Sequence, residues 1–167
     1  KTVGADEVQV LRKMLADYLA HYERNDDSLI NKIVGAYSSS LCKDPFIVMM
    51  STFPLQKDIA MHEVYDLKGS MHGREIKEKE KRAKVVIYKD NDFDSNPQRA
   101  FKLSNEKRTW FLGRLKADVE FLRRHQLIDY SMLLGIHFRD KKADLDIQST
   151  NGIEAREGVQ EVYYCEI

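Results

Sequence analysis

The sequence predicts an α+β fold with two lobes, and three observations support this class. A helical pattern covers residues 5–22, several short strand-like runs follow, and a second long helical pattern covers residues 105–126. This order lacks the regular strand–helix alternation of a parallel, doubly wound sheet. With 167 residues, of which 43% are hydrophobic, the chain can bury a core and suits one domain, or one lobe and part of a second.

Each predicted helix has its own signals. In residues 5–22, apolar side chains recur at helical spacing, and two acidic residues occupy the first turn, where they suit the positive end of the helix dipole. The helix over residues 105–126 has Ser104 or Asn105 as its cap. Its apolar face consists of Phe111, Leu115, Val119 and Leu122.

Short runs rich in β-branched and aromatic residues predict the strands. The most apolar run, residues 45–53, is expected to form a buried, central strand that Pro54 ends. Residues 63–67 would pair antiparallel with it across a long hairpin. Further strands are expected at residues 30–37, 130–138 and 160–167, a strand end at residues 1–3, an acidic turn at residues 90–97 and a polar loop at residues 139–158.

Composition and missing motifs exclude several function classes. Basic and acidic residues balance at 27 each, so the chain as a whole has no attraction for nucleic acid. Two cysteines are too few for a disulfide framework and favour a reducing, cytoplasmic location, and no signal peptide or membrane span is expected. Glycine-rich Rossmann and P-loop motifs, zinc-ligand spacings and a G-x-S-x-G elbow are all missing from the sequence.

Two segments carry the candidate chemistry, YDLKGS at residues 65–70 and IDYSMLLGIH at residues 128–137. The first places Lys68 on a glycine-flanked turn where a phosphate could be held, and the second places Asp129 beside an apolar run. Phosphoryl transfer needs a lysine on the nucleotide phosphates and an acid that orients the attacking hydroxyl. Lys1 or Lys68 could supply the lysine and Asp129 the acid.

Other interpretations of these residues stay open at this point. An unpaired buried carboxylate is costly, so Asp129 could need a ligand, a metal or a partner, but it could equally cap a backbone amide in an ordinary turn. Lys68 could be an ordinary solvent-exposed lysine. Residues 68–84 contain seven basic and three acidic side chains. On composition alone the run at residues 77–84 is better interpreted as a solvated helix face or a mobile loop than as a cationic surface facing anionic lipid.

Three motifs in order resemble the phosphatidylinositol phosphate kinases, and in particular the phosphatidylinositol-4-phosphate 5-kinases. They are YDLKGS, KDNDF at residues 89–93 and LIDYSMLLGIH at residues 127–137, with the long helix between the last two. Residues 1–3 are similar to the strand that carries the family's ATP lysine, and residues 161–167 resemble the strand that leads into its metal-binding motif. The ordered set is highly specific and covers essentially the whole chain.

The resemblance implies a two-lobed lipid-kinase fold with an antiparallel sheet. Residues 1–67 would belong to the N-lobe of a partial catalytic domain, and residues 68–167 to the lobe junction and the C-lobe. In the family, the glycine loop that covers ATP precedes the position of Lys1, and the main metal-binding aspartate follows that of Ile167. We therefore expect this stretch to be truncated at both ends and inactive alone.

The same resemblance implies roles for single residues. Lys1 would contact the α- and β-phosphates of ATP, and Lys68 would be a second lysine on these phosphates. Asp129 would be the catalytic acid that aligns the inositol hydroxyl, and it could also contact magnesium. Arg74 matches an arginine facing the phosphate already on the inositol ring, a task that suits a bidentate donor. The adenine pocket would be lined by the backbone of Ser51, Thr52 and Phe53, although the family often has Asn at the position of Thr52.

The implied activity is a lipid kinase that uses ATP and Mg²⁺. Its simplest substrate is phosphatidylinositol 4-phosphate, phosphorylated at the 5-hydroxyl to give phosphatidylinositol 4,5-bisphosphate. A 5-phosphate 4-kinase and a non-catalytic phosphoinositide-binding scaffold stay open as alternatives. The resemblance also favours peripheral attachment at the cytosolic membrane face and leaves room for a homodimer. The side chains expected to face the membrane are Lys77, Lys79, Lys81 and Arg82.

Overall fold

The fold is described from a computed structural model and consists of two compact units. The first comprises Lys1–Ser51 and Gly113–Ile128, and the second comprises Thr52–Leu112 and Asp129–Ile167. The predicted lobe boundary near residue 67 lies inside the second unit and stays a prediction. The structure describes residues 1–54, 60–97, 99–139, 152–155, 157 and 161–167.

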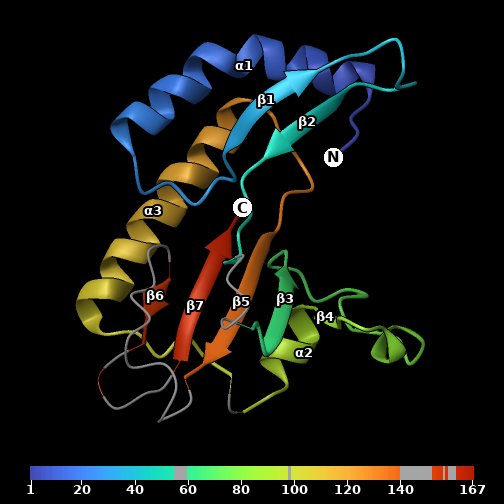
Figure 1. The fold of residues 1–167 in the computed structure, drawn as a ribbon. Helices are drawn as coiled ribbons and strands as arrows, with labels where there is room; N and C mark the ends of the chain where they lie inside the picture. Colours follow the sequence, from blue (N-terminus) through green and yellow to red (C-terminus); the bar gives the residue numbers. More distant parts are fainter. Residues whose placement is uncertain (55–59, 98, 140–151, 156, 158–160) are drawn as a thin grey trace. The chain divides into compact units, whose positions relative to one another are not determined.

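The first unit pairs a helix with a hairpin (Figure 1). Helix α1 (Ala5–Arg24) confirms the first predicted helix and extends it by two residues. Strands β1 (Ile33–Tyr37) and β2 (Phe46–Met49) form a two-stranded antiparallel sheet. Thr2 bridges to Phe46 on the outer edge of β2, as expected for a strand end at residues 1–3.

The expectation of a buried, central strand at residues 45–53 was wrong. Strand β2 is shorter, and of its residues only Ile47 is buried, while Val48 is 41% and Met49 37% exposed. A two-stranded sheet packed against one helix covers too little surface to bury both faces of a strand. The apolar composition of the run therefore predicted a strand correctly, but the burial of both faces of that strand was predicted wrongly.

A buried carboxylate holds the first unit together. Helix α3 (Asn105–Arg124) contributes its residues from Gly113 onward to this unit and carries Asp118, which is 1% exposed. One Asp118 oxygen lies 2.6 Å from His21 Nε2, and the other accepts the backbone N–H of Leu29 at 2.7 Å. A third donor is the hydroxyl of Ser28, at 2.8 Å. Because donors surround the charge, its burial is compatible with a stable core.

The second unit is built on a five-stranded sheet in the order β4-β3-β5-β7-β6 (Figure 1). Strand β3 pairs parallel with β4, and the other three pairings are antiparallel. The central strands β5 and β7 are the most buried. The strand bounds are Ile87–Tyr88 for β4, Glu63–Leu67 for β3, Met132–Phe138 for β5, Glu161–Glu166 for β7 and Ile153–Glu154 for β6.

Strand β3 confirms the bounds predicted for residues 63–67, but the predicted partner was wrong. It pairs with β4 and β5 and not with β2. Residues 55–59 of the expected hairpin connection lie outside the described residues, as do residues 140–151 of the predicted polar loop. The run at residues 130–138 confirmed a strand, shortened to β5.

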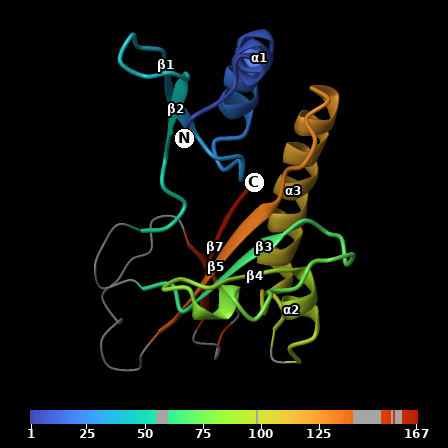
Figure 2. The ribbon, with the colours of Figure 1, turned by 90° about the vertical axis from the view of Figure 1, so that its right-hand side faces the viewer.

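The acidic stretch predicted as a turn contains a short helix, α2 (Asp90–Asp94), which lies against β3 (Figure 2). Phe93 packs edge-on against Tyr65 of β3, with ring centroids 5.1 Å apart. Phe101 continues this aromatic cluster toward Phe111 in the first turns of α3 and toward Tyr163 of β7. One turn of 3-10 helix, η1 (Glu80–Arg82), precedes β4. Of the helices described, none has the length and apolar character needed to cross a membrane.

Two glycines give a matched test of the packing. A Cβ atom at Gly135, on β5, would lie 2.5 Å from a ring carbon of Phe53 and 2.7 Å from the sulfur of Met61, whereas one at Gly113, on α3, would meet no atom within 4 Å. We expect Gly135→Ala to lower the free energy of unfolding by about 1–3 kcal/mol through overpacking. Gly113→Ala should raise it by about 0.5–1 kcal/mol, because alanine favours a helix interior. Denaturant titration of both variants measures this, and equal effects would contradict the packing.

Candidate functional site

The pairing of β3 with β5 brings two predicted site residues together. Leu67, the last residue of β3, lies opposite Met132, the first residue of β5. Lys68 directly follows β3 and Asp129 shortly precedes β5, so both lie at the same end of this pair of strands. The Lys68 Nζ atom lies 3.1 Å from Asp129 Oδ1. The YDLKGS and IDYSMLLGIH segments therefore form one site.

Asp129 has an uncommon backbone. Its φ is +61°, in the left-handed region, where aspartate is one of the few residues other than glycine to occur. Its side chain is 83% exposed, so the argument that a buried carboxylate needs a partner does not apply to it. Residues held in such conformations cluster at functional sites. The conformation and the exposure together leave this carboxylate accessible from solvent.

The turn after β3 already holds an anion, but from within the chain. The backbone N–H groups of Lys68 and Gly69 donate to Asp90 Oδ1 at 3.0 and 2.8 Å. Gly69 has a φ of +72°, which glycine adopts without strain. The sequence suggested that this turn could cradle a phosphate. In the structure its amides bind Asp90, so the predicted phosphate cradle is already occupied by a carboxylate of the chain.

Arg74 connects the end of β3 to α2. Its Nε atom donates to Asp90 Oδ2 at 2.8 Å, and its Nη2 atom donates to Asp66 Oδ2 at 3.0 Å and to the Asp66 carbonyl. The Arg74 side chain is only 15% exposed. Of the described residues, none accepts a hydrogen bond from its Nη1 atom. The role predicted for Arg74 in substrate binding stays a prediction.

The charge state of Asp90 follows from these contacts. Burial alone would raise the pKa of its carboxyl group. Hydrogen bonds from the Arg74 guanidinium and from the amides of Lys68 and Gly69 outweigh this effect and hold the pKa below its ordinary value. Asp90 is therefore the permanent anion of the turn at neutral pH.

The four basic residues predicted to face a membrane are all exposed, and they lie in and around η1. Lys81 forms an ion pair with Glu78. In the part of the chain that the structure describes, the side chains of Lys77, Lys79 and Arg82 form no ion pair. Val85, close by in sequence, is 64% exposed. These properties fit either a solvated surface or a cationic surface facing anionic lipid.

The other predicted site residues divide between the two units. Lys1 and Ser51 belong to the first unit, and Thr52 and Phe53 to the second. The backbone nitrogen of Lys1 donates to Ile47 O at 3.0 Å, while its side chain is exposed. The Phe53 ring packs against the buried cluster of β7. Their predicted roles in ATP binding stay predictions.

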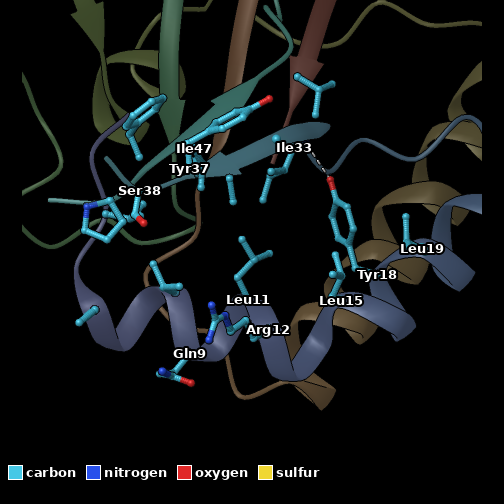
Figure 3. A pocket seen from close by; sticks show the side chains of 18 residues that line it. Gln9, Leu11, Arg12, Leu15, Tyr18, Leu19, Ile33, Tyr37, Ser38 and Ile47 are labelled. Atoms are coloured by element: carbon cyan, nitrogen blue, oxygen red, sulfur yellow. Dashed lines mark hydrogen bonds between the residues drawn. The ribbon is translucent and has the colours of Figure 1, made fainter. Parts of the chain in front are cut away.

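A cavity of about 690 Å³ lies within the first unit, between α1 and the hairpin (Figure 3). Leu11 and Tyr18 of α1 line it from one side and Ile33 of β1 from the other. The Tyr18 hydroxyl accepts the N–H of Ile33 at 2.8 Å. None of the residues predicted for ATP, substrate or metal binding lines this largely apolar cavity.

The described residues contain no cluster of three or more acidic, histidine or cysteine side chains that could hold a metal. Magnesium, however, is commonly bound through one or two carboxylates together with substrate phosphates. The exposed carboxylate of Asp129 could supply one such ligand.

Sequence reasoning missed two carboxylates that organise the structure, Asp90 and Asp118. KDNDF contributed to the motif pattern, but its first aspartate was assigned no role. The signal that could have identified it is its place at the start of a helix within an ordered motif. Asp118 lies on the long predicted helix, between Leu115 and Leu122 at helical spacing, so it shares their apolar face, where a charged residue requires a buried partner.

Comparison with known proteins gives a consistent result. A sequence model of the family described as Phosphatidylinositol-4-phosphate 5-Kinase matches residues 1–163. A probable phosphatidylinositol phosphate kinase of Dictyostelium discoideum is 39% identical over 141 residues, which cover 83% of this chain and 19% of that protein.

Two further relatives carry more specific names. The phosphatidylinositol 5-phosphate 4-kinase type-2 alpha of Sus scrofa is 32% identical over 94% of this chain and 39% of its own length. The phosphatidylinositol 4-phosphate 5-kinase of Plasmodium falciparum is 31% identical over 87% of this chain and 9% of its own length. The chain thus spans well under half of each of these relatives.

The charge on Asp90 predicts how stability depends on pH. A carboxyl group whose pKa is lowered by folding stabilises the native state above its unfolded pKa of about 3.9, and this contribution is lost as pH falls through the folded pKa. We expect wild type to exceed Asp90→Asn in unfolding free energy by a constant amount above about pH 5, with the difference shrinking below about pH 4. Denaturant unfolding from pH 3 to 7 measures it, and a difference that grows on acidification would contradict the assignment.

Proposed function

Because the chain belongs to the phosphatidylinositol phosphate kinase family, we propose that its protein transfers the γ-phosphoryl group of ATP to a phosphatidylinositol monophosphate. The simplest form of the reaction acts on the 4-phosphate at the 5-hydroxyl and gives phosphatidylinositol 4,5-bisphosphate. The observation that carries the proposal is the 3.1 Å contact between Lys68 Nζ and Asp129 Oδ1. This contact places an ammonium group that could bind a phosphate beside a carboxylate that could orient a hydroxyl.

In the proposed reaction the contact opens, and the two residues take separate tasks. Lys68 would bind the phosphates of ATP and balance their charge as the bond between the γ-phosphorus and the β–γ bridging oxygen breaks. Asp129 would orient the inositol hydroxyl, whose oxygen forms the new bond to phosphorus, and accept its proton. ADP leaves with the bridging oxygen. Catalysis of this kind depends on position and charge.

The remaining groups would complete the nucleotide site. Lys1 would add a second cation on the α- and β-phosphates, and the backbone of Ser51, Thr52 and Phe53 would contact adenine. Magnesium supplies charge neutralisation on the phosphates when bound. Asp129 would contribute one oxygen to it, and phosphates and water would supply other ligands.

Arg74 would complete the lipid site. Asp66 and Asp90 hold its Nε and Nη2 atoms, and no described residue takes a hydrogen bond from Nη1. This arrangement supports a contact between Nη1 and the phosphate already on the inositol ring. The two carboxylates would fix the orientation of the fork before substrate arrives.

Two alternatives stay open, and specific observations support the first of them. A 5-phosphate 4-kinase is supported by the pig relative of that name, which matches 94% of this chain, and by the sequence Arg74-Glu75 followed by Lys-Glu-Lys at residues 77–79. A phosphoinositide-binding scaffold would keep the fold and the cations without turnover. The 4-kinase predicts turnover of the 5-phosphate, and the scaffold predicts no product from any lipid.

The first test replaces Asp129 in the natural full-length protein. Wild type is incubated with ATP, Mg²⁺ and each of the three phosphatidylinositol monophosphates, and the product isomers are separated. We expect phosphatidylinositol 4,5-bisphosphate from the 4-phosphate, and a fall in kcat of about 10²–10⁴-fold in Asp129→Asn. Asparagine tolerates the left-handed backbone, so this change isolates the carboxylate.

Asp94→Asn, at the exposed end of α2, is the control and should leave kcat unchanged. Turnover of the 5-phosphate alone would favour the 4-kinase. No product from any lipid would favour the scaffold, and full activity in Asp129→Asn would refute the role of this residue.

We further propose that the exposed basic residues around η1 bind anionic lipid. Replacing Lys77, Lys79 and Arg82 with glutamine should weaken binding to phosphoinositide vesicles by about 100-fold, because each charge contributes about 1 kcal/mol near such a surface. The loss should be smaller at high salt. Vesicle co-sedimentation measures it, with turnover of a short-chain soluble substrate as a control for folding.

Three exposed basic residues elsewhere provide the matched control: Lys13, Lys116 and Arg124. If their replacement weakened vesicle binding as much as replacement of the basic residues around η1, the attraction would be general and the proposed lipid-binding surface would be wrong.

A further inference from the structure

We infer that Asp90 is a positioning residue for the reaction, an internal anion that shapes the turn carrying Lys68 and sets the Arg74 fork. This inference rests on the proposed kinase function. It assigns a task to a residue that contacts neither Lys68 Nζ nor Asp129 and is not expected to touch ATP or lipid.

The contacts of Asp90 support this task. It is 7% exposed, and its two oxygens receive hydrogen bonds from three different residues. Oδ1 accepts the consecutive N–H groups of Lys68 and Gly69, at 3.0 and 2.8 Å. Oδ2 accepts a hydrogen bond from Arg74 Nε at 2.8 Å and lies 3.3 Å from the backbone nitrogen of Lys68. Successive backbone amides on one anion form the type of concavity that elsewhere binds phosphate.

Two glycines give the turn conformational freedom, which the bonds to Asp90 would restrict. Gly69 and Gly73 both have positive φ values, +72° and +65°, so the segment uses conformations that cost glycine little and leave it many alternatives. The bonds to Asp90 fix the backbone at Lys68 itself. From this fixed point the lysine side chain extends to Asp129, 3.1 Å from its ammonium. Release of the backbone would displace the ammonium from this position.

A neighbouring aspartate separates positioning from simple support of α2. Asp92 Oδ2 accepts the N–H groups of Lys89 and Ile76, both at 3.0 Å, so it caps the same helix and holds the same loop. Within the part of the chain that the structure describes, Asp92 forms no hydrogen bond or ion pair with the turn after β3 or with the Arg74 side chain. Asp92→Ala therefore weakens α2 locally while leaving the contacts of Lys68 in place.

The test is a double-mutant cycle in the natural full-length protein, with kcat and KM for ATP measured separately. Asp90→Ala should lower kcat/KM by about 100-fold, the effect of displacing a catalytic group by about 1 Å. Asp92→Ala should remain close to wild type. If Asp90 acts partly through Lys68, then Asp90→Ala should have a clearly smaller effect on kcat/KM in a Lys68→Ala background, where only its contribution through Arg74 remains.

A second variant keeps the test decisive if alanine prevents folding. Asp90→Asn retains one oxygen as an acceptor and replaces the other with an NH₂ group. It can therefore accept hydrogen bonds from the amides of Lys68 and Gly69 or from Arg74 Nε, but not from both. It should fold and lose less activity than alanine. Thermal unfolding of every variant verifies folding before kinetics are compared.

The outcomes separate the inference from the proposed function. An inactive wild type would refute the kinase function itself. An active wild type in which Asp90 and Lys68 substitutions multiply independently, or in which Asp92→Ala matches Asp90→Ala, would refute the positioning role. A reduced Asp90 effect in the Lys68→Ala background would support it.

Discussion

The antiparallel pairing of β3 with β5 is the constraint on which the candidate site depends. In an antiparallel pair the end of one strand lies beside the start of the other, and here this places the residue after Leu67 near the residues before Met132. A slip of one residue would turn Val64 of β3 and its neighbours to the opposite face of the sheet. The packing of the core therefore determines which charged groups meet at this end of the two strands, although the core residues have no chemical role.

A second principle is that charged groups below the surface are paired before any ligand arrives. Asp90 pairs with Arg74 and accepts hydrogen bonds from the amides of the turn, and in the other unit Asp118 lies against the His21 ring and accepts the N–H of Leu29. Breaking such a buried pair typically costs about 3–5 kcal/mol, whereas its net contribution to stability is small. These carboxylates are better understood as devices that select one geometry than as sources of stability.

The sequence predicted those features that repeat locally. Periodicity gave α1 and α3, and alternation gave the bounds of β3, because each pattern lies within one segment. It failed where tertiary contacts decide: the run that forms β2 was expected to be central, and α2 is too short for a helical period to appear. The motifs identified Lys68 and Asp129, yet their direct contact and the link from Arg74 to Asp90 join segments 61 and 16 residues apart. No local pattern records such distances.

The contact between Lys68 and Asp129 differs from the buried pairs, because it is open to water on the side of the acid. Exposed ion pairs contribute about 0–1 kcal/mol, so separating these two charges requires almost no work. Each charged group partly neutralises the other in this structure, and either can exchange its partner for a group that binds more strongly. Under the proposed function, an incoming phosphate would meet a cation that is already in place and weakly paired, and the carboxylate that it displaces would become free to orient the acceptor hydroxyl.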